Sequence, residues 1–359
     1  MTDYKQKILA IVFLPPPHNG QSIFSKKLIE NLSGPYDVET ITINGGIARK
    51  IFNILYASYI ILFRTNSSTK VYLTPPGNNG LYPYLIIPAV LKMKKNQCYV
   101  HHHSSRAITQ YPQRGTKALF YLLKGISCHI FLCNCVSNEF KKLYANSDPL
   151  METITLSNAF LFFNEQPINH EQGVYTLAHL SVITWDKGIE YFLKLASACI
   201  LSTEYRFKFS LAGPVKDPDI LSMIHDFAEK FPNDFEYQGA VFNNEKDEFF
   251  KQIDALILPS KLADETEPLV MYEAYSYGAE FFATDRGCIK SNIHGENKIL
   301  TMNLEEDKKN ILREAKLFYE DHLSYKNAAK NHGKELCVIS QVQYKKFLSM
   351  LDECYTNNN

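Results

Sequence analysis

The chain has 359 residues, of which 45% are hydrophobic and 21% are charged, with 16 Gly and 16 Pro. This composition excludes disordered and fibrous proteins, and the length favours two globular domains of about 150 residues each. The formal net charge is zero, but residues 1–160 carry 17 Lys and Arg against 7 Asp and Glu. The two halves of the chain therefore have opposite charge, and the basic half favours an anionic partner such as a membrane surface. No nucleic-acid-binding motif accompanies the basic residues, so we expect no nucleic acid partner.

The cysteines and the first residues bear on the compartment. The eight cysteines are scattered, without the Cys-x-x-Cys pairs of zinc sites or the spacing of a small disulfide-bonded scaffold. The first apolar run, Ile8–Leu14, ends in prolines and has no small-residue cleavage site, so it predicts a strand and not a signal peptide. We therefore expect a cytoplasmic protein, peripheral on the inner face of the cell membrane.

Short apolar runs alternate with longer amphipathic segments through the first half, as in βα units around a parallel sheet. We predict strands at Ile8–Leu14, Val38–Ile43, Val71–Leu73, Gln97–His102, Ile130–Cys133 and Thr153–Leu156. We predict helices between them at Gln21–Ser33, Ile51–Leu62, Leu81–Met93, Thr116–Lys124 and Ser137–Tyr144. Polar or small residues follow each strand, which places ligand chemistry at the carboxyl edge of the sheet.

Residues 158–173 lose the periodicity and predict a linker, after which a second alternation begins. Its predicted strands are Val174–Ser181, Phe207–Ala212, Phe235–Gln238, Ala255–Leu258 and Phe281–Thr284. Its predicted helices are Ile189–Ile200, Ile220–Phe231, Lys246–Gln252 and Leu269–Tyr277. The pattern predicts two Rossmann-like, doubly wound parallel-sheet domains, 1–165 and 166–339, that face each other across a ligand cleft.

The segment Pro259–Gly278, PSKLADETEPLVMYEAYSYG, is the most informative for chemistry. Glu265 lies on a loop after a strand, and Glu273 lies eight residues later, inside a helix that begins after Pro268. A helix amino terminus offers unpaired N–H groups to a phosphate, and carboxylates accept hydrogen bonds from sugar hydroxyls. One short segment can therefore hold both halves of a nucleotide sugar.

This segment resembles glycosyltransferase family 4, whose members share a Glu-x7-Glu element after a strand that ends in Pro-Ser. The resemblance implies the GT-B fold, in which the last helix, here about residues 340–359, packs back on the first, acceptor-side domain. It also implies that Glu265 contacts the donor sugar, that Glu273 holds the ribose, and that the amides of Leu269 and Val270 meet the phosphates.

Lys187-Gly188 follows the first strand of the second half and resembles the phosphate-binding Lys-Gly of the family. The family usually has an Arg five residues before this Lys, and Val182 occupies that place here. Half of the cationic clamp on the leaving diphosphate is therefore missing. Arg286, which follows the strand Phe281–Thr284, is a candidate substitute.

Two positions in the first half match the family pattern as well. Gly20 precedes an amphipathic helix after the first strand, where a glycine lets the backbone approach a ligand. His103 ends the strand in CYVHHHSSRA and matches the histidine that faces the donor sugar in the family, with His102 as the fallback. Side chains alternate along a strand, so at most His101 and His103 share a side, which argues against a three-histidine metal site.

The resemblance implies sugar transfer from a nucleoside diphosphate sugar to an acceptor hydroxyl, with retention, in cell-surface polysaccharide or lipid-linked glycan synthesis. Glu265, His103 and Lys187 are the catalytic candidates. Gly20, Glu273, Leu269, Val270 and Arg286 are the donor-binding candidates, and no metal or other cofactor is expected. The acceptor would be a glycan or a lipid-linked saccharide. The alternatives are a catalytically weak or inactive nucleotide-sugar-binding protein and a nucleotide-sugar epimerase.

Overall fold

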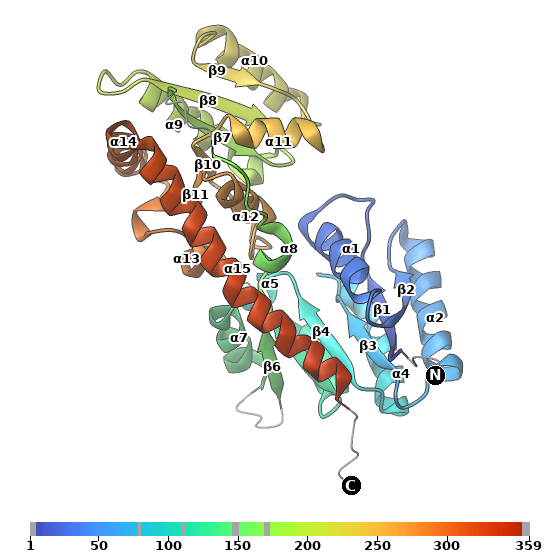
Figure 1. Ribbon diagram of the computed structural model, residues 1–359. Helices are drawn as coiled ribbons and strands as arrows, with labels where there is room; N and C mark the ends of the chain where they lie inside the picture. Colours follow the sequence, from blue (N-terminus) through green and yellow to red (C-terminus); the bar gives the residue numbers. More distant parts are fainter. Residues whose placement is uncertain (1–4, 78–79, 110–112, 146–150, 169–172, 354–359) are drawn as a thin grey trace. The chain divides into compact units, whose positions relative to one another are not determined.

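The computed structural model describes residues 5–77, 80–109, 113–145, 151–168 and 173–353. The chain forms two compact units, Met1–Leu161 with Ser340–Asn359 (unit 1) and Phe162–Ile339 (unit 2). The units divide after Leu161, whereas the sequence places the division after residue 165, within a linker whose residues 169–172 lie outside the described part. Each unit is a six-stranded sheet flanked by helices (Figure 1), which confirms the prediction of two doubly wound parallel-sheet domains.

The sheet of unit 1 contains all six predicted strands, with ends displaced by a few residues. They are β1 (Lys7–Val12), β2 (Asp37–Thr42), β3 (Lys70–Leu73), β4 (Cys98–His102), β5 (Ser127–Phe131) and β6 (Glu152–Thr155). Their order in the sheet is β2-β1-β3-β4-β5-β6, and every neighbouring pair is parallel. The carboxyl ends of all six strands therefore lie at one edge.

The helices of unit 1 are α1 (Gly20–Leu32), α2 (Ile47–Arg64), α3 (Leu81–Tyr84), α4 (Ile86–Lys94), α5 (Arg106–Thr109), α6 (Arg114–Leu123), α7 (Asn134–Phe140) with a π-helical turn (Lys141–Ala145), and α8 (Ala159–Phe162). The predicted helix Leu81–Met93 is divided at Leu85 into α3 and α4. Pro88 explains the division, because it has no N–H for the carbonyl of Tyr84 and is tolerated only in the first turn of a helix.

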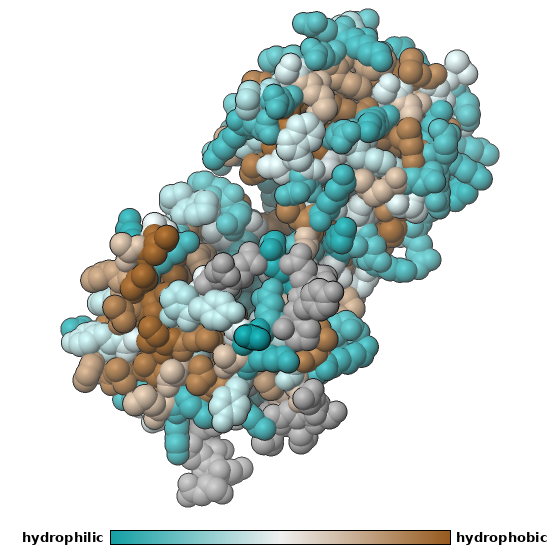
Figure 2. Space-filling model, turned by 180° about the vertical axis from the view of Figure 1, so that it is seen from behind, coloured by the Kyte–Doolittle hydropathy of each residue, from teal (hydrophilic) through white to brown (hydrophobic). Residues whose placement is uncertain are grey.

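Two helical layers cover the sheet of unit 1. The core on one face contains side chains from α2, α3, α4 and α6. On the other face, Phe347 packs against Tyr72 and Tyr99, and the Tyr99 hydroxyl donates to the carbonyl of Met350 at 2.5 Å. The outer side of the first layer is apolar, as Figure 2 shows in brown over α2.

The sheet of unit 2 contains β7 (Tyr175–Leu180), β8 (Phe207–Ala212), β9 (Phe235–Tyr237), β10 (Ala255–Leu258), β11 (Glu280–Thr284) and β12 (Ile299–Leu300). Its order is β12-β11-β10-β7-β8-β9, again parallel throughout. Five of these strands are predicted from the sequence. The sixth, β12, has only two residues and is too short to produce a periodic pattern.

The helices of unit 2 are a 3₁₀ turn (Trp185–Lys187), α9 (Ile189–Ile200), α10 (Pro218–Lys230), α11 (Asn244–Lys251), α12 (Leu269–Ser276), α13 (Ile289–Asn292), a second 3₁₀ turn (Glu296–Lys298), α14 (Leu304–Glu320) and the start of α15 (His322–Asp352). The final helix begins at His322, well before the start at about residue 340 that the sequence analysis gives. It passes through Gly333, where a Cβ atom would lie 2.6 Å from Tyr275 and 2.7 Å from Phe163, so the close packing at this position favours glycine.

From Ser340 onward, α15 belongs to unit 1. The Tyr36 hydroxyl donates to Asp352 at 2.8 Å, and the Lys70 ammonium donates to the carbonyl of Glu353 at 2.7 Å. These contacts attach the end of the chain to the starts of β2 and β3.

Candidate active site

The order in which the chain adds strands to the sheet of unit 2 reverses between β7 and β10. The chain passes from β7 to β8 on one side and from β10 to β11 on the other, while β7 and β10 are neighbours. The loops that leave these two strands therefore diverge at their carboxyl ends. Open α/β sheets bind ligands in the crevice at such a point.

A close backbone contact joins the two diverging loops. Gly188 has a φ of +82°, and a Cβ atom there would lie 2.0 Å from the carbonyl oxygen of Pro259. The amide of Lys261 donates to the carbonyl of Asp186 at 2.7 Å. Only glycine satisfies both the left-handed conformation and the close approach, so the residue after Lys187 is fixed by geometry.

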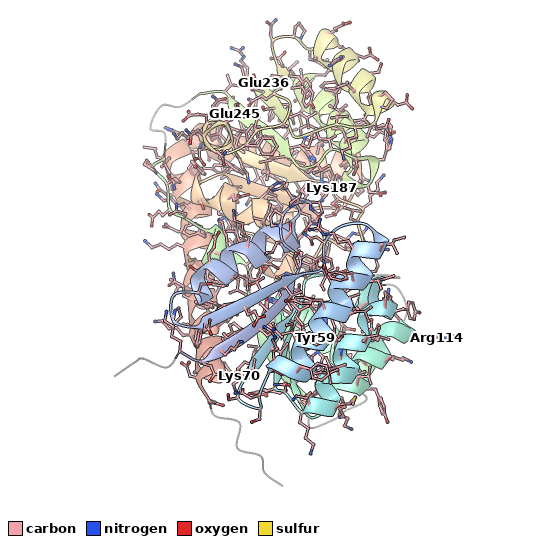
Figure 3. The ribbon with its side chains drawn as sticks, turned by 90° about the vertical axis from the view of Figure 1, so that its right-hand side faces the viewer. Tyr59, Lys70, Arg114, Lys187, Glu236 and Glu245 are labelled. Carbon is pink, nitrogen blue, oxygen red and sulfur yellow. The ribbon has the colours of Figure 1, made fainter. Side chains whose placement is uncertain are left out.

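Lys187 and Glu265 form an ion pair at this crossing. The Lys187 Nζ atom lies 2.5 Å from Glu265 Oε2, and the side chains are 21% and 11% exposed. Figure 3 labels Lys187, which comes from the 3₁₀ turn after β7. Glu265 comes from the loop after β10, so each strand at the switch point contributes one charge.

A buried histidine of the sheet, His179, lies near this pair. It lies on β7, and its Nδ1 atom is 2.9 Å from the carbonyl oxygen of Ile257 on β10. Burial lowers the pKa of His179 to about 4, so the ring is neutral near pH 7. A neutral imidazole adds no competing cation beside Lys187.

The helix α12 begins four residues after Glu265, at the end of the same loop. Its N-cap residue is Pro268, which has an extended backbone and makes no side-chain capping hydrogen bond. Leu269 and Val270, the first two residues of the helix, are partly exposed. Their amide N–H groups have no partner within the helix, so they are available to an anion.

Glu273 lies one turn into α12 and pairs with a lysine from another helix. Its Oε1 atom accepts from Lys246 Nζ of α11 at 2.6 Å. Its Oε2 atom is buried and has no hydrogen-bond partner within the described residues. A buried carboxylate oxygen without a donor is costly, and a ligand hydroxyl can satisfy it.

A buried polar network fixes the start of α12. The carboxylate of Glu267 accepts from the Tyr272 hydroxyl and from Asn292 Nδ2, both at 2.7 Å. Asn292 Nδ2 also lies 3.0 Å from the Tyr272 hydroxyl. The network ties the loop before the helix to α13 and holds the exposed amides in place.

Arg286 lies on the loop after β11, beside the Glu265 loop. Its neighbour Gly287 has a φ of +51°, and a Cβ atom there would lie 2.6 Å from the carbonyl oxygen of Thr266. The Nε atom of Arg286 is buried and has no hydrogen-bond partner in the described chain. Val182, which follows β7, is 48% exposed.

One Asp-x-Asp sequence occurs near the site, at Asp217–Asp219, and it has a structural role. Asp217 is the N-cap of α10, and its Oδ1 atom accepts from the amide of Asp219 at 3.0 Å. Its Oδ2 atom accepts from Trp185 Nε1 at 2.8 Å. The carboxylate of Asp217 therefore caps a helix and anchors the turn that carries Lys187.

In unit 1, α1 begins with Gly20 at the carboxyl end of β1. Asn19 caps the helix through its Oδ1 atom, which accepts from the amide of Ser22 at 2.9 Å. Gly20 is exposed and has no positive φ, so its backbone conformation does not require glycine. Phe24 of α1 packs on the His103 ring with a centroid distance of 4.8 Å. Unit 1 thus brings the helix of Gly20 next to His103.

The three histidines at the end of β4 divide between two sides, as the strand geometry predicts. The His101 and His103 rings lie against each other, tilted by 31° with centroids 4.1 Å apart, whereas His102 Nε2 lies 2.9 Å from His129 Nδ1. Burial lowers the pKa of His103 to about 3, which keeps it neutral. His103 also lines a cavity of about 50 Å³ with Arg106, and its Nε2 atom lacks a partner among the described residues.

The structure thus groups the predicted residues within each unit. Lys187, Glu265, Leu269, Val270, Glu273 and Arg286 lie at or beside the carboxyl edge of the sheet in unit 2. Gly20 and His103 lie at the corresponding edge in unit 1. The sequence analysis missed Lys246 because its partner Glu273 is 27 residues away on another helix. Nothing in the local pattern of α11 distinguishes this lysine from an ordinary exposed one.

Comparison with solved structures shows that this arrangement is the GT-B fold. A glycosyltransferase from Rickettsia africae superposes with a TM-score of 0.69 at 14% identity, over 99% of this chain and 100% of that one. HepE from Anabaena, solved with UDP, gives 0.68 at 12% identity, over 96% and 100%. Sucrose-phosphate synthase from Thermosynechococcus elongatus gives 0.66 at 13% identity, over 96% and 99%.

One family model matches the sequence of unit 2. Residues 162–335 match the model described as glycosyl transferases group 1. A search of curated protein sequences finds no match. The structural likeness at these identities concerns the fold, and the glycosyltransferase assignment rests on the family match.

We predict that Gly188→Ala destabilises unit 2 by at least about 2 kcal/mol, because a methyl group collides with the carbonyl of Pro259 at a positive φ. Gly239→Ala is the matched control, since Gly239 has a φ of +71° but no atom lies within 4 Å of the place that its Cβ would take. It should cost about 1 kcal/mol. Urea unfolding measures both, and equal losses would contradict the close contact.

Proposed function

We propose that this chain transfers a sugar from a nucleoside diphosphate sugar to an acceptor hydroxyl, with retention, as a member of glycosyltransferase family 4. The observation that carries the proposal is the Lys187–Glu265 pair at the switch point, next to the uncapped amino terminus of α12. It supplies a cation, a carboxylate and helix-terminal amides in one place. These are the groups that a sugar joined to a diphosphate requires.

The donor would bind by replacing partners in the ion pairs of unit 2. The diphosphate accepts hydrogen bonds from the ammonium of Lys187 and from the amides of Leu269 and Val270. Glu265, which now accepts from Lys187, can then accept from a hydroxyl of the donor sugar instead. Glu273 accepts from the ribose hydroxyls, for which its buried Oε2 atom has an unused acceptor position.

Transfer needs stabilisation of the charge that develops on the leaving diphosphate. Lys187, the helix terminus and Arg286 would supply it, with Arg286 in place of the cation that is absent at Val182. In this proposal no divalent metal is required. His103, held neutral by burial, would contact the donor sugar as a hydrogen-bonding group and not as a cation. We assign no enzymic base to the acceptor.

The comparisons support the donor class. HepE was solved with UDP and with UDP and glucose, and it shares the fold over 96% of this chain. We propose a glycan or a lipid-linked saccharide as the acceptor, in cell-surface polysaccharide or lipid-linked glycan synthesis. A cytoplasmic location, peripheral on the inner face of the membrane, is part of this proposal. No helix in the described part of the chain has the length and apolar character needed to cross a bilayer.

One observation favours a second candidate, a nucleotide-sugar-binding protein with weak or no transfer activity. Val182 is exposed and uncharged where the family usually places Arg. If Arg286 does not replace that cation, the donor binds but the leaving group is poorly stabilised. The two candidates differ in turnover and not in binding.

Glu265→Gln should lower transfer by about 10²–10³-fold, because it removes the carboxylate that contacts the donor sugar. Product formation with radiolabelled nucleotide sugars and a lipid-linked saccharide mixture measures this, and Glu296→Gln, whose side chain is 86% exposed, is the control. Wild-type turnover by Glu265→Gln would remove the assignment. Conversion of the donor without any acceptor would indicate an epimerase.

Glu273→Gln should weaken UDP binding by roughly 30-fold, equivalent to about 2 kcal/mol for hydrogen bonds to a charged group. Titration calorimetry with UDP measures it against the same Glu296→Gln control. Glu265→Gln should bind UDP as the wild type does, since it contacts the sugar. Unchanged affinity of Glu273→Gln would contradict its ribose role.

Val182→Arg should strengthen UDP binding by about fivefold, because it adds a cation beside the diphosphate at a position with room for it. The gain should shrink at high salt. Val338→Arg is the matched control, since Val338 is 54% exposed on the same unit but lies on α15. Equal effects of the two variants would show that residue 182 is not beside the phosphates.

A further inference from the structure

The outer side of α2 carries a continuous stripe of large apolar side chains. Their exposed fractions are 80% for Ile47, 44% for Ile51, 65% for Phe52, 52% for Leu55, 45% for Tyr56, 49% for Tyr59 and 72% for Phe63. Their successive separations of one, three or four residues place all seven within one half of the helix circumference. A stripe of this size is unusual on a protein surface that meets only water.

This stripe is separate from the packed side of α2. Ile54, Ala57 and Ile61 are buried against the sheet of unit 1 and belong to its core. The helix is therefore apolar on two opposite faces. Packing against the sheet explains the inner face and leaves the outer face unexplained.

The neighbouring helices of the same layer extend the apolar surface. Tyr82 of α3, Ile86 and Met93 of α4, and Tyr121 of α6 are 55%, 42%, 76% and 76% exposed. Figure 2 shows apolar side chains gathered over α2, and Figure 3 labels Tyr59 of α2 and Arg114 of α6, a helix that packs beside α4. We call this surface, formed by the outer sides of α2, α3, α4 and α6, the α2 face.

The stretch of sequence that forms the α2 face carries charge of one sign. Between Glu39 and Glu139 the sequence contains 11 Lys and Arg and no Asp or Glu. Arg49, Lys50 and Arg64 lie on α2, and Lys92 and Lys117 lie on α4 and α6, all exposed. Cations therefore lie at both ends of α2 and on the neighbouring helices, and this stretch of the sequence contributes no carboxylate.

We infer that the α2 face docks on the surface of an anionic lipid bilayer, with α2 lying in the plane of the interface. Apolar side chains enter the acyl boundary, tyrosines sit at the headgroup level, and the Lys and Arg side chains meet lipid phosphates. A helix of 18 residues with three cations, about 27 Å long, lies on a bilayer and does not cross it.

The positive charge of the α2 face favours an anionic bilayer over a second copy of the chain as its partner. Two α2 faces brought together would oppose many cations with no anion between them, which disfavours a symmetric dimer. An anionic bilayer satisfies both the apolar and the basic parts of the surface. The inference does not rest on the proposed transfer reaction, because no residue of the α2 face belongs to the candidate site.

Flotation of the full-length chain with vesicles tests the inference. We expect binding to vesicles of phosphatidylcholine and phosphatidylglycerol in equal parts, and much weaker binding to phosphatidylcholine alone. Raising the salt concentration should weaken the first interaction, since the cations act through screened attraction. Absence of binding to the anionic vesicles at low salt would overturn the inference.

Two double variants separate the contributions. Phe52→Ser with Phe63→Ser should weaken partitioning at least about tenfold through lost apolar insertion. Arg49→Gln with Lys50→Gln should weaken it about 30-fold through lost attraction. The matched controls in unit 2 are Leu201→Ser with Phe242→Ser, which are 68% and 60% exposed, and Lys208→Gln with Lys216→Gln.

The controls should bind as the wild type does. If they weaken binding as much as the α2 variants, the α2 face is not the docking surface.

Light scattering after size-exclusion chromatography measures the oligomeric state and tests the alternative of a second copy. A dimer that Phe52→Ser with Phe63→Ser dissociates would assign the face to a second copy and overturn the inference. Nucleotide binding by the α2 variants should remain unchanged, which keeps this test independent of the proposed transfer reaction.

Discussion

The contact between Gly188 and the carbonyl of Pro259 is the constraint on which the arrangement of unit 2 depends. It brings together two loops that leave neighbouring strands in opposite directions, at the point where an α/β sheet opens a crevice. Because it is a backbone contact, it tolerates no side chain at residue 188. Lys187 and Glu265 meet where they do because the loops that carry them are locked together here.

The charges of the candidate site are held in pairs that a ligand can exchange. Lys187 pairs with Glu265 and Lys246 pairs with Glu273, and all four side chains are partly buried. Pairing avoids the cost of isolated charges away from water. A nucleotide sugar offers a phosphate to the lysine and hydroxyls to the carboxylates, so it can replace each partner with a comparable one. The unsatisfied atoms of Glu273 and Arg286 mark where such a ligand gains most.

Unit 1 carries its two notable surfaces on different parts of the fold. Its carboxyl edge carries Gly20 and His103, while the outer layer of helices carries the apolar and basic α2 face. Burial keeps His103 neutral, which suits a hydrogen-bonding contact with an uncharged sugar. The same unit can therefore serve an active site at one edge of its sheet and a bilayer surface on a face of its helical layer.

The sequence by itself determined the two parallel-sheet domains and the Glu-x7-Glu segment, because alternating apolar runs and a helix that starts after Pro268 are local features. It left β12, the early start of α15 and the pairing of Lys246 with Glu273 undetermined, since these depend on contacts between distant residues. It also provided no reason for glycine after Lys187. That reason is a carbonyl oxygen 2.0 Å from where a Cβ atom would lie, 71 residues further along the chain at Pro259, and only the tertiary structure brings the two together.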